Sequence, residues 1–225
     1  MSLSPSQNNK TLRRRREILE GASRVFRERG LHATGMRDIA AELDMHVGNL
    51  YYYFRNKQDL LAFCQQDALD GLLSRARTVR KEELRADTQL FKLIYAHVHL
   101  LNYELPASLA HLEIEALEPE VRQPVLRQRD EYERLLRETV DEGIRSGLFR
   151  QTDPKVATLA ILGAVNWTVK WFRLGGPAKI EEIARQFAEY LVMGLLTPGI
   201  QPEFPDSSEL AFLVGSGSPS PEQRL

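Results

Sequence analysis

The 225-residue chain has a single cysteine, Cys64, so no intrachain disulfide can form and a cysteine-based zinc site is disfavoured. No apolar run approaches the roughly 20 residues that a membrane-spanning helix needs. The first ten residues are polar and lack the apolar core of a secretory signal. No glycine-rich phosphate loop, nucleophile elbow or acid/base pair is recognisable, which argues against an enzyme. We therefore expect a cytoplasmic protein without a metal, a cofactor or a membrane partner.

The net charge of −1 says little by itself, but the charges are unevenly distributed. Residues 1–60 hold 11 Lys/Arg and 7 Asp/Glu, a balance of +4, whereas residues 61–225 hold 19 and 24, a balance of −5. A basic N-terminal part on an acidic remainder would keep an anionic partner such as DNA at one end of the molecule. Chance segregation would give the same modest difference, so this pattern is supporting only.

Apolar residues recur at helical spacing almost throughout, and no stretch alternates with a period of two. The pattern predicts an all-α protein of about nine helices. We expect Gly30 and Gly147 to end helices as left-handed residues, and Asp153-Pro154 to begin one. Pro124 should lie in the first turn of the longest amphipathic helix, and a shorter helix is expected over residues 108–117.

Residues 34–57 read TGMRDIAAELDMHVGNLYYYFRNK, which predicts two short helices joined by a tight turn. Ala40 supplies the small residue that lets the two helices cross closely. Asp44 stands at the turn, where a positive φ is required, and it tolerates that conformation better than most residues. Val47 and Leu50 can be buried against the first helix, so the opposite face of the second helix is free to enter the major groove of DNA.

The run from Gly30 to Leu61 resembles the N-terminal domain of the TetR family of bacterial transcriptional regulators. Matching residues include Gly30, Thr34, Ile39-Ala40, Gly48, Leu50-Tyr51, Tyr53-Phe54 and Lys57. The sequence departs from the family pattern at Gly35, Asp44, His46 and Tyr53. The resemblance implies a helix-turn-helix DNA-binding domain (11–57) and a helical ligand-binding and dimerisation domain (58–197). Composition predicts a disordered N-terminus (1–10) and a mostly disordered tail (198–225) in which Leu210 to Val214 could dock.

The chemistry of the side chains and the resemblance together give the candidate DNA contacts. Lys57 should bind a phosphate as a point charge, and Asn49 and His46 can bond base edges. Tyr51 is expected in the core. The arginine run 13–16 is either a solvated helix face or an arm that touches phosphate. The predicted DNA contacts are Arg37, His46, Gly48, Asn49, Tyr52, Tyr53 and Lys57.

The stretch from Asp153 to Phe172 is apolar on most of its circumference, which predicts a helix buried on all sides. In so small a body this favours a two-fold dimer in which the last two long helices pair with their copies. A dimer also places two recognition helices in successive major grooves of a palindromic operator. A monomer with a very apolar core is the alternative. The predicted interface residues are Leu159, Leu162, Phe187, Leu191 and Leu195.

Polar tips among apolar residues, on the helices before Pro106 and before Gly175, are typical of a pocket that orients a ligand. Packed core residues with satisfied polar groups would give the same pattern. Residues 147–194 also resemble a TetR subgroup of fatty-acid and steroid catabolism regulators, which implies an acyl-CoA effector. The predicted ligand contacts are Phe91, Tyr95, His99, Tyr103, Asn166, Trp167 and Trp171.

The sequence thus predicts a DNA-binding regulator, a homodimeric repressor that a small apolar ligand or an acyl-CoA releases from its operator. Two alternatives remain open at this point. One is a helical architectural or partner-binding DNA protein without small-molecule control. The other is a repressor of drug efflux induced by an apolar drug. Activation of transcription instead of repression is equally compatible with the sequence.

Overall fold

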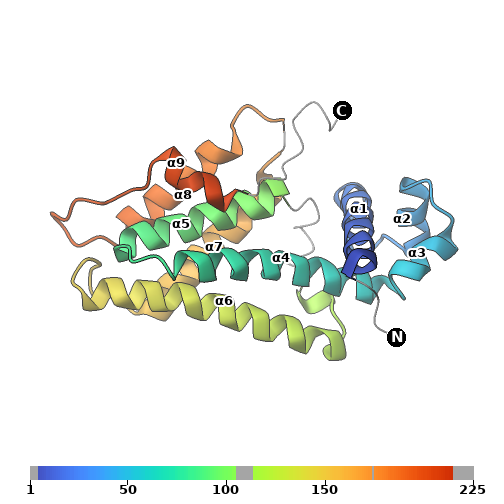
Figure 1. Cartoon of the computed structure of the whole chain (residues 1–225), viewed down its shortest axis with the longest axis horizontal. Coiled ribbons are helices and arrows are strands. Elements are labelled where there is room, and N and C mark those ends of the chain that lie inside the picture. The colour runs from blue at the N-terminus through green and yellow to red at the C-terminus, as the bar shows by residue number, and fades with distance from the viewer. Residues whose placement is uncertain (1–4, 105–113, 174, 215–225) are drawn as a thin grey trace. The chain divides into compact units, whose positions relative to one another are not determined.

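The computed structural model describes residues 5–104, 114–173 and 175–214, and regular structure within these ranges is helical (Figure 1). The fold class predicted from the sequence is confirmed, with one isolated bridge in the described ranges, between Phe149 and Leu196. The α-helices are α1 (Pro5–Arg29), α2 (Met36–Glu42), α3 (Val47–Tyr53), α4 (Lys57–Val79), α5 (Ala86–His99), α6 (Pro119–Arg145), α7 (Pro154–Trp171), α8 (Ile180–Met193) and α9 (Ser207–Leu210). A π-helical segment, η1 (Leu100–Glu104), continues α5, and 3-10 turns form η3 (Ile114–Ala116) and η4 (Ala211–Leu213).

Two compact units divide the chain. The first unit comprises Met1–Ala68 and Leu105–Leu126, and the second unit comprises Leu69–Glu104 and Arg127–Leu225. Helix α4 contributes residues to both units, because the division falls inside it. The domain boundary expected from the sequence, at residue 57, coincides with the first residue of α4.

The core of the first unit is built from the helical faces that the sequence pattern predicts. Ile18 and Ala22 of α1, Ile39 of α2 and Leu50 of α3 are all fully buried. Val47, expected in this core, is only partly covered. Gly30 ends α1 with φ of 81°, the left-handed conformation that glycine adopts without strain.

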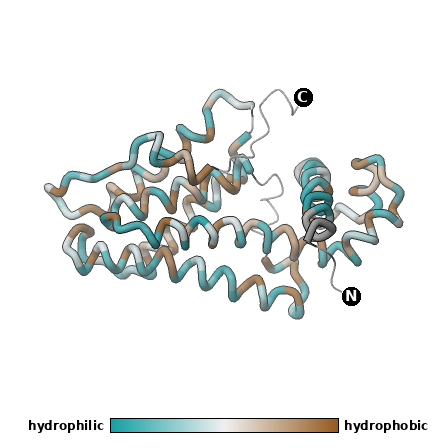
Figure 2. Tube along the Cα trace, viewed as in Figure 1, coloured by the Kyte–Doolittle hydropathy of each residue, from teal (hydrophilic) through white to brown (hydrophobic). Residues whose placement is uncertain are grey.

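In the second unit, α5 is buried along its whole length and packs most extensively against α8. It also contacts α7, so the helix lies in the middle of the unit's core. Hydrophobic and hydrophilic residues alternate along the helices, as expected where each helix buries one face (Figure 2). The carboxylate of Asp153 caps α7 by accepting hydrogen bonds from the amides of Lys155 (2.8 Å) and Val156 (3.2 Å), as predicted.

Two helix starts differ from the sequence expectation. Helix α1 begins at Pro5, inside the segment expected to be disordered, since extending an existing helix costs far less than nucleating one and proline is tolerated in a first turn. Helix α6 begins at Pro119, which places Pro124 beyond the first turn. The carbonyl of Glu120, which Pro124 cannot bond, belongs to an exposed residue and can meet water.

The C-terminal segment (residues 200–214) packs on the second unit instead of being disordered. Leu210 and Leu213 are buried, which agrees with the prediction that Leu210 to Val214 could dock. The hydroxyl of Thr88 on α5 donates to the carbonyl of Glu203 at 2.7 Å. The few apolar residues of this segment are enough to anchor it, although its overall composition is typical of disorder.

The helix predicted over residues 108–117 falls mostly on residues 105–113, outside the described ranges, and Ile114–Ala116 form the 3-10 turn η3. Within the described ranges, no helix combines the length and the apolar character that crossing a membrane would require.

Candidate nucleic-acid interface and effector site

The turn between α2 and α3 has the geometry that the sequence predicts. Asp44 is the non-glycine residue with positive φ, 49°, among the described residues. Its neighbour Met45 donates its amide to the carbonyl of Ala40 at 2.8 Å, which closes the turn. Ala40 is buried at the crossing, so the two helices approach closely. An aspartate can therefore replace the usual glycine of this turn at modest cost.

His46 is the N-cap of α3, a role that sequence reasoning did not assign to it. Its Nδ1 accepts a hydrogen bond from the amide of Gly48 at 3.2 Å. A neutral histidine that accepts at Nδ1 carries its proton on Nε2. Capping and base contact are therefore compatible, since the exposed ring keeps an outward donor.

The side chains of the candidate DNA contacts are all at least partly accessible to solvent. Arg37, His46, Gly48, Asn49 and Tyr52 are exposed, and Tyr53 and Lys57 are partly covered. Tyr52 is 81% exposed, which is far more than a packing role would leave. The expectation that Tyr51 lies in the core is wrong, because its side chain is 48% exposed and extends the polar aromatic surface of α3.

Lys57 is the first residue of α4, and its ammonium group makes a hydrogen bond within the chain. Nζ donates to the carbonyl of Leu31, in the segment between α1 and α2. Partial burial lowers the pKa of Lys57 from its ordinary value. An ammonium has three donors, so one contact orients the group and leaves two N–H groups for another acceptor.

The arginine run 13–16 makes contacts within the first unit. Arg15 lies over the rings of Phe54 (4.5 Å to the centroid) and Phe63 (3.9 Å). Arg16 bonds Asp67 through two of its nitrogens, at 2.7 and 3.0 Å. Arg13 and Arg14 contact Glu17. Most of the run therefore serves the packing of α1, and Arg13, with 85% of its side chain exposed, is the member most open to solvent.

Gly21 is a position that the sequence analysis missed. A Cβ atom on Gly21 would lie 2.3 Å from Cδ2 of Leu43, the residue that follows α2, so the side chain of Leu43 would have to move to admit any larger residue. Glycine in the middle of a helix is otherwise unfavourable by roughly 1 kcal/mol. A glycine inside a strongly helical pattern was the available signal for this contact.

In the second unit, four of the predicted ligand residues lie at helical spacing along one face of α5 and η1. The rings of Tyr95 and His99 are 6.1 Å apart, and those of His99 and Tyr103 are 5.2 Å apart. Phe91 begins the row and meets Phe204 of the C-terminal segment at 5.0 Å. We call these four residues the aromatic row. A π-helical segment such as the one carrying Tyr103 is frequent at functional sites.

Asn166, predicted with the same set, lies elsewhere. Its Oδ1 accepts from His97 Nε2 at 3.1 Å, while His97 Nδ1 accepts from the hydroxyl of Tyr132 at 2.9 Å. Burial is the main cause that lowers the pKa of His97 to about 4, so the ring is neutral near pH 7. This chain of bonds joins α5, α6 and α7 and is a structural contact, because all the polar atoms facing one another are satisfied.

Trp167 and Trp171 do not point into the unit. They are 62% and 44% exposed, on a face of α7 that also carries Val156 and Leu159. The ring of Trp171 stacks on that of Phe187 of α8 at 6.1 Å. We call this surface, with Tyr190 and Met193 of α8, the apolar face.

The apolar face corrects two expectations. The face of α7 is open to solvent in the single chain, so the helix is not buried on all sides. Of the predicted interface residues, Leu159 is exposed, Leu162, Phe187 and Leu191 are partly covered, and Leu195 is buried in its own chain.

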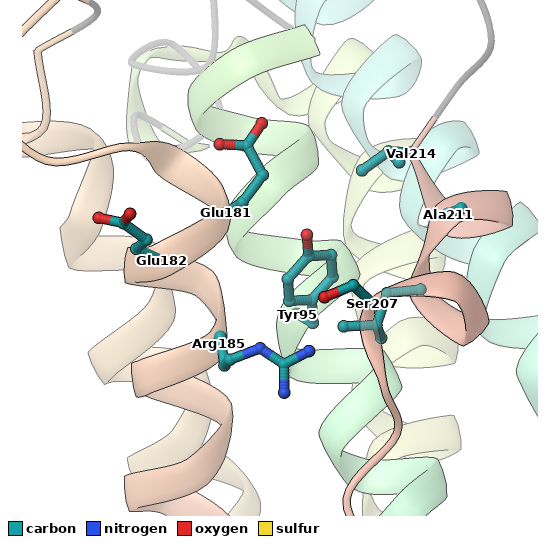
Figure 3. Close-up of a pocket in the computed structure, with 8 residues that line it drawn as sticks. Tyr95, Glu181, Glu182, Arg185, Ser207, Ala211 and Val214 are labelled. Atoms are coloured by element: carbon teal, nitrogen blue, oxygen red, sulfur yellow. The ribbon is translucent and has the colours of Figure 1, made fainter.

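A cavity of about 350 Å³ lies between α5, α8 and the C-terminal segment (Figure 3). Tyr95 is the member of the predicted ligand set that lines it, together with Glu181 and Arg185 of α8 and Leu210 of α9. The volume is at the lower end of the ~300–1,000 Å³ typical of small-molecule pockets, so a small ligand fits better than a whole coenzyme.

Comparison with known proteins agrees with the architecture. Residues 18–63 match the model of bacterial regulatory proteins of the tetR family, and residues 83–195 match the tetracyclin repressor-like C-terminal domain. The chain belongs to the TetR family. It is therefore a transcriptional regulator and not an enzyme, as the sequence predicted.

Individual relatives of this TetR-family chain have modest identity but nearly complete coverage. The transcriptional repressor KstR2 of Rhodococcus jostii is 26% identical over 194 residues, 82% of this chain and 92% of the relative. The fatty acid metabolism regulator of Bacillus subtilis is 27% identical over 183 residues, 80% and 94% of the two chains. The structure of AibR with isovaleryl coenzyme A and operator DNA has a TM-score of 0.69 at 28% identity and covers 81% of this chain and 98% of AibR.

Proposed function

We propose that this TetR-family regulator acts in the cytoplasm as a homodimeric repressor of a palindromic operator and is released by an acyl-CoA or another small apolar effector. The observation that carries the proposal is the pair of exposed surfaces. One is the polar aromatic surface of α3, and the other is the apolar face of α7 and α8. The surface of α3 can bind DNA, and the apolar face can be buried against a second copy of the chain. A two-fold dimer on a palindromic operator accounts for both surfaces.

For DNA recognition, we assign the contacts to the seven residues predicted on α2, α3 and the start of α4. Asn49 and the outward Nε2 of His46 bond base edges, and Tyr52, Tyr53 and Lys57 meet phosphates or thymine methyl groups. Gly48 lets the backbone of α3 approach the groove. Two copies of α3 then reach major grooves roughly 34 Å apart.

The apolar face proposed for dimerisation contains aromatic side chains as well as leucine. Trp167, Trp171 and Tyr190 add aromatic surface, which is the kind that dominates the energetics of interfaces. A patch of this kind left in water favours association. Leu159, Leu162, Phe187 and Leu191 contribute to the same interface, whereas Leu195 supports it from inside.

Similar proteins and the aromatic row of the second unit both support the proposed effector. A fatty acid regulator and a protein crystallised with isovaleryl coenzyme A are among the similar proteins. The aromatic row on α5 and η1 offers rings and polar tips inside an apolar unit. The effector acts through α4, which contributes residues to both units. Near-complete switching requires a differential affinity of roughly 5.5 kcal/mol between the two conformations.

The test begins with selection of an operator from random duplex DNA, followed by mobility-shift titrations. We expect a pseudo-palindrome, and a loss of affinity of at least tenfold with one class of acyl-CoA but not with coenzyme A alone. Selection of no preferred palindrome would refute the repressor and favour an architectural DNA protein. A palindrome that no acyl-CoA affects, but that the matching free acids or an apolar drug release, would refute only the acyl-CoA assignment.

A further inference from the structure

The C-terminal segment lies beyond the stretch that matches the family's C-terminal domain, which ends at residue 195. Polar contacts fasten it to α5 and to α4: the amide of Glu203 donates to the buried carboxylate of Asp87 at 2.8 Å, and Nε of Arg75 donates to the carbonyl of Leu213 at 2.7 Å. Contacts at both of its ends hold the segment in one position.

This segment supplies one wall of the cavity shown in Figure 3. Ser207, Leu210, Ala211 and Val214 line one side, and α5 and α8 form the others. The wall is apolar apart from the hydroxyl of Ser207. The cavity therefore exists only because the segment is docked.

Tyr95 is the buried polar group of this cavity. The residue is 5% exposed, and no hydrogen bond of its hydroxyl is found among the described residues, but the oxygen itself is not fully buried. Its donor and its acceptor positions are therefore open to a polar group that enters the cavity. Burial and then the nearby charge of Glu181 raise the pKa of Tyr95, whereas Arg185 opposes them.

Two opposite charges flank the side chain of Tyr95. Glu181 and Arg185 are four residues apart on α8, a spacing at which such residues usually pair, but they do not form an ion pair with each other among the described contacts. Figure 3 shows the carboxylate of Glu181 and the guanidinium of Arg185 at opposite ends of the ring of Tyr95. Each has a longer-range charged neighbour: Glu181 lies 3.9 Å from Nε2 of His99, and Arg185 forms an ion pair with Glu189 at 3.8 Å and also interacts with the charge of Asp206.

We propose that this cavity binds a small zwitterion with an apolar side chain, of the size and kind of an aliphatic α-amino acid. The carboxylate of the ligand pairs with Arg185, its ammonium group pairs with Glu181 and bonds the Tyr95 hydroxyl, and its side chain contacts Leu210 and Val214. Arg185 has one long hydrogen bond, to the carbonyl of Pro205 at 3.3 Å, so most of its five donors remain for a carboxylate.

A ligand with one charge fits less well. A carboxylate alone would satisfy Arg185 but would lie near the carboxylates of Glu181 and Glu182, which also line the cavity. A cation alone would be placed near Arg185 without a counter-charge. Only a molecule that carries both charges meets each end with an attractive partner, and charge-assisted hydrogen bonds are the stronger ones.

Three probes that share one isobutyl group test the proposal by isothermal titration calorimetry on the full chain at pH 7.5. They are L-leucine, 4-methylpentanoate, which lacks the ammonium group, and 3-methylbutylamine, which lacks the carboxylate. We expect leucine to bind at least tenfold more tightly than either analogue. Equal affinity for leucine and one analogue, or no binding of leucine, would overturn the proposal.

Variants then locate the site. Ala211→Trp fills the cavity from an exposed position and should abolish leucine binding, whereas Ala178→Trp, at an exposed alanine that does not line the cavity, should not. Glu181→Gln should reduce leucine affinity to that of 4-methylpentanoate, and Arg185→Gln should reduce it to that of 3-methylbutylamine. Thermal unfolding midpoints check that each variant is folded. Leucine binding that survives Ala211→Trp would place the ligand elsewhere and refute the assignment.

Discussion

Trp167 provides the strongest test of the proposed dimer. It is 62% exposed on the apolar face, and we predict that Trp167→Ser weakens self-association severely. Covering that fraction of a tryptophan of ~250 Å² removes roughly 155 Å² from water, which at ~25 cal/mol per Å² is worth about 4 kcal/mol per protomer. Because a two-fold interface holds two copies, the upper limit is about 8 kcal/mol per dimer.

Association itself reduces this figure, since side chains are ordered and polar groups are desolvated at the interface. Allowing half of the upper limit leaves about 4 kcal/mol, or roughly a thousandfold rise in the dimer dissociation constant. Sedimentation velocity from nanomolar to micromolar concentration measures the constant for both proteins. Tyr52→Ser is the matched control, because Tyr52 is an aromatic residue on the DNA-binding unit that is even more exposed, at 81%.

A dissociation constant for Trp167→Ser within twofold of the wild-type value would show that α7 does not form the interface. A wild-type chain that sediments as a monomer at micromolar concentration would dispose of the dimer altogether. Because the residue is largely exposed in the single chain, its loss should leave the urea midpoint of the monomeric unit almost unchanged. The effect on association can therefore be separated from an effect on folding.

Three further predictions concern single side chains. Lys57→Ala should weaken binding to all DNA sequences alike and lower the slope of log affinity against log salt by about one unit, and a change confined to one operator position would contradict the phosphate role. Asn49→Ala should instead relax the base preference at one position of each half-site by roughly 1–3 kcal/mol, measured by competition against single-base operator variants. For His97, the pKa of about 4 in the folded chain lies below its ordinary value of 6.5, so the unfolded state binds the proton more tightly. Stability should be complete above pH 6.5 and fall as the pH drops toward 4, by roughly 2 kcal/mol at pH 5, and urea unfolding of His97→Gln at pH 7 and 5 should lack this component.

The DNA-binding half was predictable because its determinants are local. Helical periodicity, a small residue at Ala40 and a turn residue at Asp44 all act within a few positions of one another, and the structure has each in the expected place. His46 shows the limit of this reasoning. Its replacement of a usual serine cap was recognised as a departure, but whether a ring nitrogen could reach the amide of Gly48 depends on a rotamer that no pattern encodes.

Contacts between distant parts of the chain could not be read from the sequence. His97 bonds Tyr132 and Asn166, which are 35 and 69 residues away along the chain. His97 and Asn166 were recognisable as polar tips in apolar helices, whereas Tyr132 belonged to the apolar face of an amphipathic helix. Periodicity assigns a residue to a face of its own helix, but it does not say which helix that face meets. For this reason Asn166 was grouped with the wrong neighbours.

The tryptophans show a different limit, since an aromatic residue in an apolar helix has two possible surroundings. Trp167 and Trp171 were assigned to a ligand pocket, whereas the same pattern fits a face that a second chain covers. Hydropathy cannot separate these cases, because both remove the ring from water. The exposed fraction in the single chain does separate them, and for Trp167 it favours a partner chain over a ligand.

The C-terminal segment is a second part of the chain whose surroundings could not be predicted from hydropathy. Its composition predicts disorder, yet three apolar residues and two clusters of polar contacts hold it against α5. Docking brings an apolar wall beside the hydroxyl of Tyr95 and the guanidinium of Arg185, while Glu181 keeps 55% of its side chain exposed. Arg185 bonds the segment at the carbonyl of Pro205, at 3.3 Å, and Glu181 and Arg185 do not pair with each other among the described contacts. Two opposite charges beside a hydroxyl that lines the cavity are the reason to expect a ligand there.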